Sequence, residues 1–204
     1  MKDRSTLYLA CSALGMLALA AAPAPQAHAD DARAQAATTQ HHSADRNKPS
    51  ELVKIVRQAT AKYRDVEVAE GDDYHLLFGC VSGDDSGAMG LHYVNLGLYA
   101  KPDGTFDDKV DPWQPEIVIY EPAAGGRPRL IGADYIIDAA TWDRTHAQAP
   151  ELNGQIFHYF PAPNRFGLPA FYTLHVWAWK DNPTGTFVNW HHDVSCDAYD
   201  GPSK

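Results

Sequence analysis

The sequence predicts an α+β fold that is mostly β: a curved antiparallel sheet or small β-barrel, capped by one N-terminal amphipathic helix. Only one segment, at residues 50–65, clearly repeats its apolar residues at helical spacing. After it, seven short runs rich in β-branched and aromatic residues alternate with turns of Gly, Pro, Asp and Asn. With so few helices between strands, a regular βαβ alternation and a parallel sheet are not expected.

The chain begins with the features of a secretory signal peptide at residues 1–29. A charged start precedes an apolar run at Leu7–Ala22, and Ala27-His28-Ala29 offers the small-x-small pattern of a cleavage site. The apolar run, about 16 residues, is shorter than the roughly 20 residues of a membrane-spanning helix. We therefore expect export to the periplasm or the extracellular space, with no membrane attachment after cleavage. A retained N-terminal membrane helix is the alternative.

The rest of the chain divides into a lead-in and one domain. Residues 30–49 contain almost no large apolar side chains, which predicts a disordered lead-in, and residues 50–204 have the size of a single β-rich domain. The 204 residues carry 17 Lys and Arg against 26 Asp and Glu, a formal net charge of −9. Nucleic-acid binding relies on basic side chains that neutralise phosphates, so this acidic chain is not expected to bind nucleic acid.

The predicted elements follow from local signals. Ser50 is a good N-cap and Glu51 suits the positive end of a helix dipole, so a helix should start there. Its apolar positions are Leu52, Ile55, Val56, Ala59 and Tyr63. The predicted strands are 76–81, 90–99, 116–120, 129–137, 155–160, 171–179 and 186–190, and a second helix is expected at 139–148.

Two cysteines, Cys80 and Cys196, remain if Cys11 leaves with the signal peptide. Export would place them where disulfides form and persist, and each lies at or near a predicted strand. We expect them to form an intramolecular disulfide. A catalytic pairing of cysteine with histidine is the competing interpretation.

Three histidines, His92, His158 and His175, each occupy the middle of a predicted strand, in phase with apolar residues. Alternate side chains of a strand share a face, so all three should point toward the interior. Glu121 ends another strand in the same phase and can lie at the rim of that interior. Imidazoles that converge with one carboxylate suit Zn, Cu, Fe or Mn, although each histidine can equally be a hydrogen-bonded core residue.

These ligands suggest an exported protein that binds a transition metal, either as a small metalloenzyme or as a protein that merely carries the ion. No local spacing such as H-x-H or H-E-x-x-H supports the prediction. The alternative is a binding module without chemistry for a small apolar or aromatic ligand. Its pocket would be lined by Tyr93, Tyr159, Trp177 and Trp179. The sequence does not indicate an oligomeric state.

Three stretches carry a resemblance: Cys80–Gly83 with Gly87–Asn95 (CVSG and GAMGLHYVN), Pro115–Pro122 (PEIVIYEP) and Asn164–Pro183 (NRFGLPAFYTLHVWAWKDNP). Together they resemble a group of exported bacterial proteins of unknown function, over most of residues 50–196. The resemblance implies export and a single domain. It implies no activity and no catalytic residue.

Overall fold

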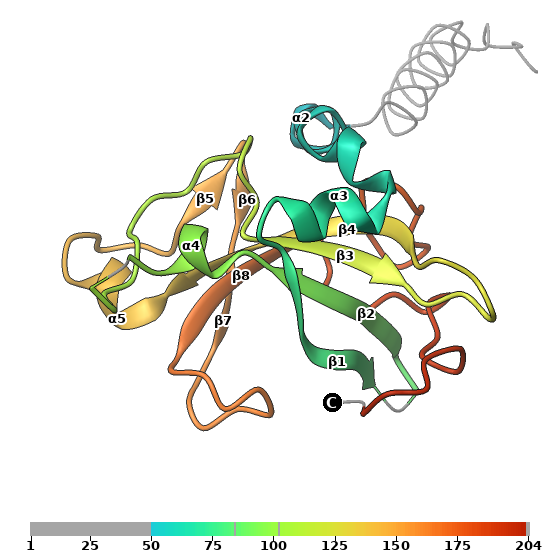
Figure 1. The fold of residues 1–204 in the computed structure, drawn as a ribbon. Helices are drawn as coiled ribbons and strands as arrows, with labels where there is room; N and C mark the ends of the chain where they lie inside the picture. Colours follow the sequence, from blue (N-terminus) through green and yellow to red (C-terminus); the bar gives the residue numbers. More distant parts are fainter. Residues whose placement is uncertain (1–49, 84, 102, 203–204) are drawn as a thin grey trace, which may run out of the picture. The chain divides into compact units, whose positions relative to one another are not determined.

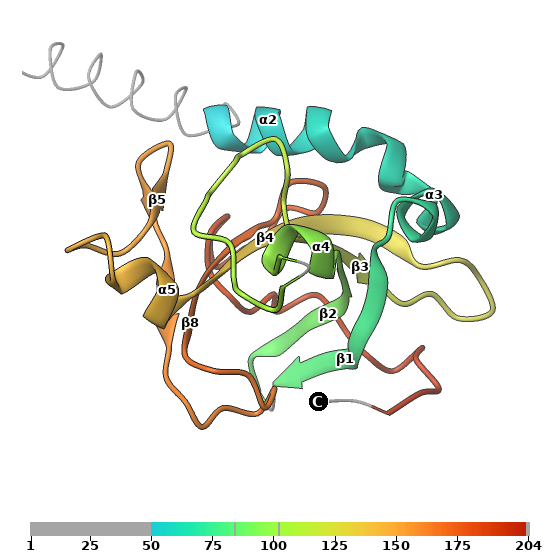
Figure 2. The ribbon, with the colours of Figure 1, turned by 60° about the vertical axis from the view of Figure 1, so that its left-hand side comes forward.

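The computed structural model describes residues 50–83, 85–101 and 103–202. The predicted signal peptide (1–29) and lead-in (30–49) lie outside the described residues. The described chain is mostly β, with a curled antiparallel sheet and a helix before it (Figures 1 and 2), which confirms the predicted fold class. Among the described residues, no helix has the length and apolar character needed to span a membrane.

The described chain starts with the predicted amphipathic helix. Helix α2 spans Glu51–Thr60 and continues as a 3-10 helix, η1, at Ala61–Arg64. The Ser50 hydroxyl caps it by accepting a hydrogen bond of 3.3 Å from the backbone N–H of Val53. A further short helix, α3, spans Val66–Gly71. The side of α2 that packs inward is formed by Leu52, Val53, Val56 and Thr60.

Six antiparallel strands form the main sheet, in the order β1-β2-β3-β4-β8-β7. They are β1 (His75–Gly83), β2 (Gly87–Val94), β3 (Ile117–Glu121), β4 (Arg129–Asp138), β7 (His158–Phe160) and β8 (Phe171–Val176). The sheet curls away from the helices into a half-barrel whose two edges are β1 and β7 (Figure 1). A separate pair joins β5 (Glu151–Leu152) to β6 (Gln155–Ile156).

Side chains alternate along each strand, and in the strands β2, β3, β4 and β8 both faces of the sheet are mostly buried. The outer face packs against α2, η1 and α3 through Tyr135 and Leu174 on one side and Tyr93 and Tyr120 on the other. The inner face carries a third apolar cluster that includes Ile117. Residues of the β7–β8 connection and of the C-terminal segment cover this inner face, among them Phe166, Leu168, Trp177 and Val194.

Five predicted elements differ from the structure, among them the strand predicted at 171–179, which ends at Val176. Residues 186–190 form turns rather than a strand, and near them the chain pairs with the sheet only through the isolated bridge Ala88–His191. The predicted strand 90–99 stops at Val94, because the Asn95 side chain accepts hydrogen bonds from two backbone N–H groups and starts helix α4 (Leu96–Tyr99). The other two changes are the division of 155–160 into β6 and β7 and the shortening of the second helix to α5 (Ala139–Asp143).

The predicted disulfide between Cys80 and Cys196 is confirmed, with Cα atoms 5.8 Å apart. Cys80 lies in β1 and is fully buried, and Cys196 lies in the irregular C-terminal segment. The bridge spans a sequence separation of 116 residues. It therefore ties the end of the described chain to the first strand of the sheet.

One carboxyl group, that of Glu116, is buried just before β3, with 5% of the residue exposed. It accepts a hydrogen bond of 3.2 Å from the backbone N–H of Ile136. Burial raises the pKa of Glu116 to about 8, and the nearby carboxylates of Asp134 and Asp107 act in the same direction. Glu116 is therefore mostly protonated at neutral pH.

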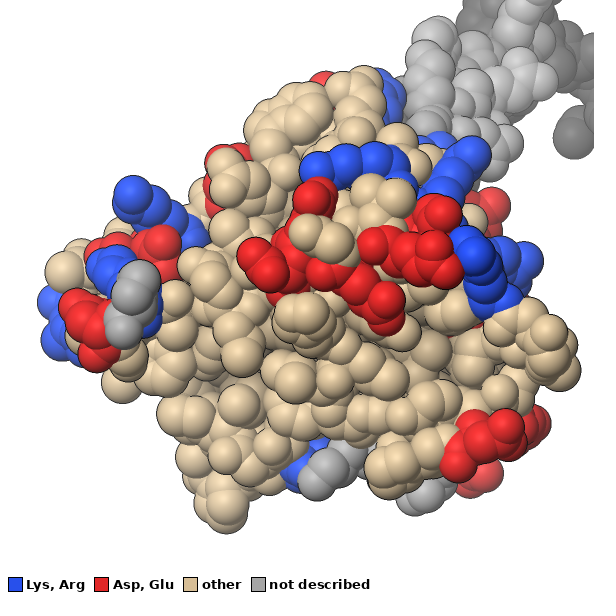
Figure 3. All heavy atoms as spheres, in the orientation of Figure 1, with Lys and Arg blue, Asp and Glu red and all other residues tan. Residues whose placement is uncertain are grey.

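Charged side chains gather on the helix-covered side of the described unit, where acidic and basic groups alternate (Figure 3). Lys62 pairs with Asp72 at 2.6 Å, and Arg127 lies between Asp65 at 3.1 Å and Glu67 at 2.9 Å. In the same view, the area over β1 and β2 carries few charged side chains. In this view the helix-covered side therefore carries more charged side chains than the area over β1 and β2.

Candidate metal centre

The strand register places His92, Asp134 and His175 on the inner face of the half-barrel. Asp134 in β4 pairs directly with His175 in β8, so their side chains share a face. His92 lies on β2, three strand spacings from β8 in the sheet order. In a flat sheet that separation would be roughly 14 Å between backbones. Because the sheet curls, the two imidazole ring centroids are only 5.6 Å apart.

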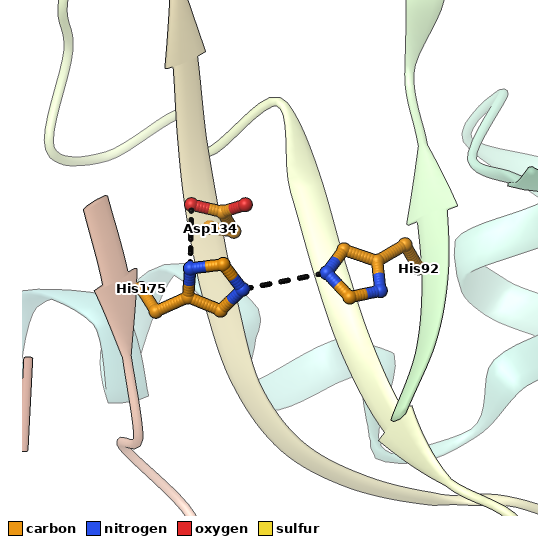
Figure 4. Close-up of side chains that lie close together, drawn as sticks. All are labelled: His92, Asp134 and His175. Atoms are coloured by element: carbon orange, nitrogen blue, oxygen red, sulfur yellow. Dashed lines mark hydrogen bonds and ion pairs between the residues drawn. The ribbon is translucent and has the colours of Figure 1, made fainter. Parts of the chain in front are cut away.

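The three side chains form a chain of contacts (Figure 4). The Nε2 atoms of His92 and His175 face each other at 3.4 Å. On the other side of its ring, the Nδ1 atom of His175 lies 3.5 Å from Oδ1 of Asp134. The same Oδ1 accepts a hydrogen bond of 2.5 Å from the Thr173 hydroxyl. His92, Asp134 and His175 are 5%, 3% and 3% exposed, so the cluster is closed off from bulk water.

Burial sets the charge states of this cluster. Burial lowers the pKa of His92 to about 4, and the neighbouring His175 adds to the effect. Burial also lowers the pKa of His175 to about 3. For the carboxyl group of Asp134, burial raises the pKa to about 6, partly opposed by His92 and by the Thr173 hydroxyl. Near neutral pH both imidazoles are therefore uncharged and available as ligands.

The hydrogen-bond partners determine where the imidazole protons lie. Nδ1 of His92 is 3.2 Å from the carbonyl oxygen of Gly90, which can only accept, so this nitrogen carries the proton. An ionised Asp134 likewise favours a proton on Nδ1 of His175. The two Nε2 lone pairs then point at each other. Two facing lone pairs repel, and either a proton shared between the two nitrogens or a metal cation removes this repulsion.

A small cavity adjoins the cluster. Its volume is about 30 Å³, enough for one or two molecules of the size of water. The polar residues in its wall are the three cluster residues and Thr173. Its apolar wall consists of Phe78, Met89, Ile117, Ile136, Phe160, Phe166, Leu168 and Phe171.

Two of the predicted metal ligands do not join the cluster. His158 shares the inner face, since it pairs with Thr173, but it lies on the edge strand β7 and its side chain is exposed. It is near enough to contribute to the lowered pKa of His175. The carboxylate of Glu121 instead binds Lys180 and Arg129, each at 2.5 Å. These cations outweigh the effect of burial and lower the pKa of Glu121.

The predicted aromatic pocket is not formed, because its four residues lie in different places. Tyr93 is on the outer face, against Tyr120, and Tyr159 is 55% exposed. Trp179 donates a hydrogen bond of 2.9 Å to Thr60 in α2. Trp177 alone lies near the cluster, with its ring centroid 5.8 Å from that of His175. Strand alternation and the split of residues 155–160 separate the four side chains.

The sequence-based search missed Asp134, which is central to the cluster. The available signal was a carboxylate in the middle of an otherwise apolar strand, Leu130–Ile137. Such a residue is rarely buried without a partner. Its partner became visible only with the register between β4 and β8.

Comparisons of this chain with protein-family models, with curated proteins and with solved structures find no match. The class of molecule is therefore defined by its own architecture: an antiparallel half-barrel with a buried His-Asp-His cluster that can hold a metal ion.

Proposed function

We propose that this protein is exported and holds one transition-metal ion between Nε2 of His92 and Nε2 of His175. The observation that carries the proposal is the 3.4 Å separation of these atoms. Two ligands at 2.0–2.1 Å from a tetrahedral metal lie about 3.4 Å apart, so the pair needs little rearrangement. Both imidazoles are neutral, Nδ1 of His92 contacts a backbone carbonyl oxygen, and Nδ1 of His175 lies 3.5 Å from Asp134 without a hydrogen bond to it.

Asp134 lies where it would orient the metal ligand His175 rather than bind the ion itself. Candidate ligand atoms from His92, Asp134 and His175 lie within 4.8 Å of one another. The contact of 3.5 Å from Oδ1 of Asp134 is to Nδ1 of His175, on the side of that ring away from the facing Nε2 atoms. This contact resembles the carboxylate–histidine–metal arrangement that fixes the imidazole tautomer.

The chemistry of the ligand atoms narrows the range of metals that this site would bind. Imidazole nitrogens suit Zn, Cu and Fe, whereas Mn prefers sites richer in oxygen. Two histidines leave open positions at the ion, and these would face the cavity described above. An ion with open positions can activate water or oxygen, so a small metalloenzyme is the form of the proposal that we favour over a metal carrier.

Export rests on the signal-peptide features of residues 1–29 and agrees with the disulfide. On the same grounds we propose that the chain belongs to the exported bacterial group that it resembles. The alternative, a binding module for an aromatic ligand, has less support. A cavity that holds benzene measures about 150 Å³, whereas the cavity beside the cluster measures about 30 Å³.

A cobalt titration tests the metal proposal. The protein is purified without a histidine tag, stripped of metal, and titrated with Co²⁺ while its visible d–d absorption is recorded. We expect one equivalent to bind in the wild type, and no binding in His92→Gln or His175→Gln. The control is His158→Gln, which removes an exposed imidazole from the same face of the sheet and should bind normally. Stoichiometric cobalt in folded His92→Gln and His175→Gln proteins would overturn the assignment.

A further inference from the structure

The strained conformation of Phe78 suggests that it has a special role. Its φ angle is 68°, a left-handed value that bulky side chains rarely adopt. The other non-glycine residues with positive φ in the described chain are Asp73 and Asn153, whose short polar side chains tolerate it. Such strain persists where surrounding structure enforces it, and it often marks functional sites.

The strain arises from a bulge in β1. Leu77 pairs with His92 and Cys80 pairs with Leu91, so Phe78 and Gly79 are two extra residues in the edge strand. Gly79 also has a φ angle of 68°. The bulge directs the Phe78 side chain into the wall of the cavity beside the histidine pair.

Phe78 meets Phe166 across the opening of the half-barrel. Their ring centroids are 5.4 Å apart, although Phe78 belongs to the edge strand β1 and Phe166 to the connection that follows the other edge, β7. We call this contact between Phe78 and Phe166 the seam. Here the two aromatic rings pack together over the inner face of the sheet. The cavity wall reflects this arrangement: its partly exposed residues are Phe78, Phe160, Phe166 and Leu168, whereas the cluster lies on its buried side.

We propose that the seam between Phe78 and Phe166 admits a small uncharged molecule, of the size of dioxygen, to the open side of the His92–His175 pair. The residues of the seam are apolar and offer no partner to a charged ligand on its way in, and the cavity volume of about 30 Å³ excludes larger molecules. The surface over β1 and β2 likewise carries few charges (Figure 3). This inference rests on the proposed function for the metal ion that the small molecule would reach. The route through the seam does not depend on that ion.

Dioxygen itself can test the route in the metal-free protein. Dissolved oxygen is paramagnetic and speeds the relaxation of methyl groups that it approaches. Under oxygen pressure, we expect the methyl groups of Met89, Ile117 and Ile136 (2%, 4% and 7% exposed) to relax at least about twofold faster than those of Leu91 and Leu130 (4% and 5% exposed), which do not line the cavity. Equal relaxation in the two sets would overturn the proposal.

A second arm uses the cobalt-loaded protein and imidazole, an uncharged ligand too large for the cavity. The wild type should bind it weakly, whereas Phe78→Gly, which suits the left-handed backbone and opens the seam, should bind it roughly tenfold more tightly. The matched control is Asn153→Gly, which relieves a similar backbone conformation elsewhere and should behave as the wild type. Equal imidazole binding by all three proteins would refute the role of Phe78. If cobalt does not bind at all, the proposed function fails, and the oxygen measurement alone decides the route.

Discussion

Replacing Glu116 by glutamine should make the stability of the protein less sensitive to pH. Glutamine keeps the shape of the side chain and can still accept the hydrogen bond from Ile136, but it cannot ionise. The carboxyl pKa is raised from 4.5 to about 8 by burial. A carboxyl group with a raised pKa contributes stability that is fully present below pH 4.5 and is lost as the pH rises toward 8.

The size of the effect follows from the shift. Raising the pKa from 4.5 to about 8 corresponds to at most about 5 kcal/mol, since each pKa unit is worth about 1.4 kcal/mol. The free energy of unfolding, measured by urea denaturation at pH 5, 6.5 and 8, should therefore favour Glu116→Gln over the wild type progressively as the pH rises. Because the two proteins share all their other titrating groups, the contributions of those groups cancel when the two free energies of unfolding are subtracted at each pH.

A matched control comes from Glu121, whose pKa is lowered rather than raised because Lys180 and Arg129 outweigh its burial. Its contribution to stability is present above its ordinary pKa and is lost as the pH falls. Glu121→Gln should therefore be less stable than the wild type at neutral pH, with the difference shrinking in acid. The reasoning about Glu116 is refuted if the free-energy difference between Glu116→Gln and the wild type stays constant from pH 5 to 8.

Two further predictions concern the disulfide and the cluster. Replacing both Cys80 and Cys196 by alanine should lower the free energy of unfolding by about 4–5 kcal/mol, because the bridge closes a separation of 116 residues. Urea denaturation measures this, and a loss below about 1 kcal/mol would contradict it. Asp134→Asn should weaken metal binding by about 10–100-fold without abolishing it, because Asp134 orients His175. Competition with a chelator measures the affinity; complete loss of binding would instead make Asp134 a direct ligand.

The sequence was sufficient for those features that depend on local pattern. The helix at 51–64 and most of the strands follow from periodicity, and the inward direction of His92 and His175 follows from their phase with apolar neighbours. The disulfide followed from counting cysteines. The helix, the strands and the direction of the histidines each depend on a few neighbouring residues, and the disulfide follows because only two cysteines remain after the predicted signal-peptide cleavage.

The composition of the cluster could not be predicted in this way, because it depends on strand order. His158 has the same local pattern as His175, yet it lies on an edge strand and is exposed. Glu121 is in phase with the interior, but Lys180 and Arg129, which come from elsewhere in the chain, bind it. The curl that brings His92 to His175 is a property of the whole sheet, and no single strand encodes it.

The bulge at Phe78 and Gly79 also has a consequence for contacts between separate chains. A half-barrel leaves two strand edges, and a regular edge strand can pair with a strand of another molecule and start aggregation. The two extra residues interrupt the hydrogen-bonding pattern of β1, so this edge is a poor template for such pairing. A deletion that straightened β1 would relieve the backbone, but it would also give the sheet an edge that invites association.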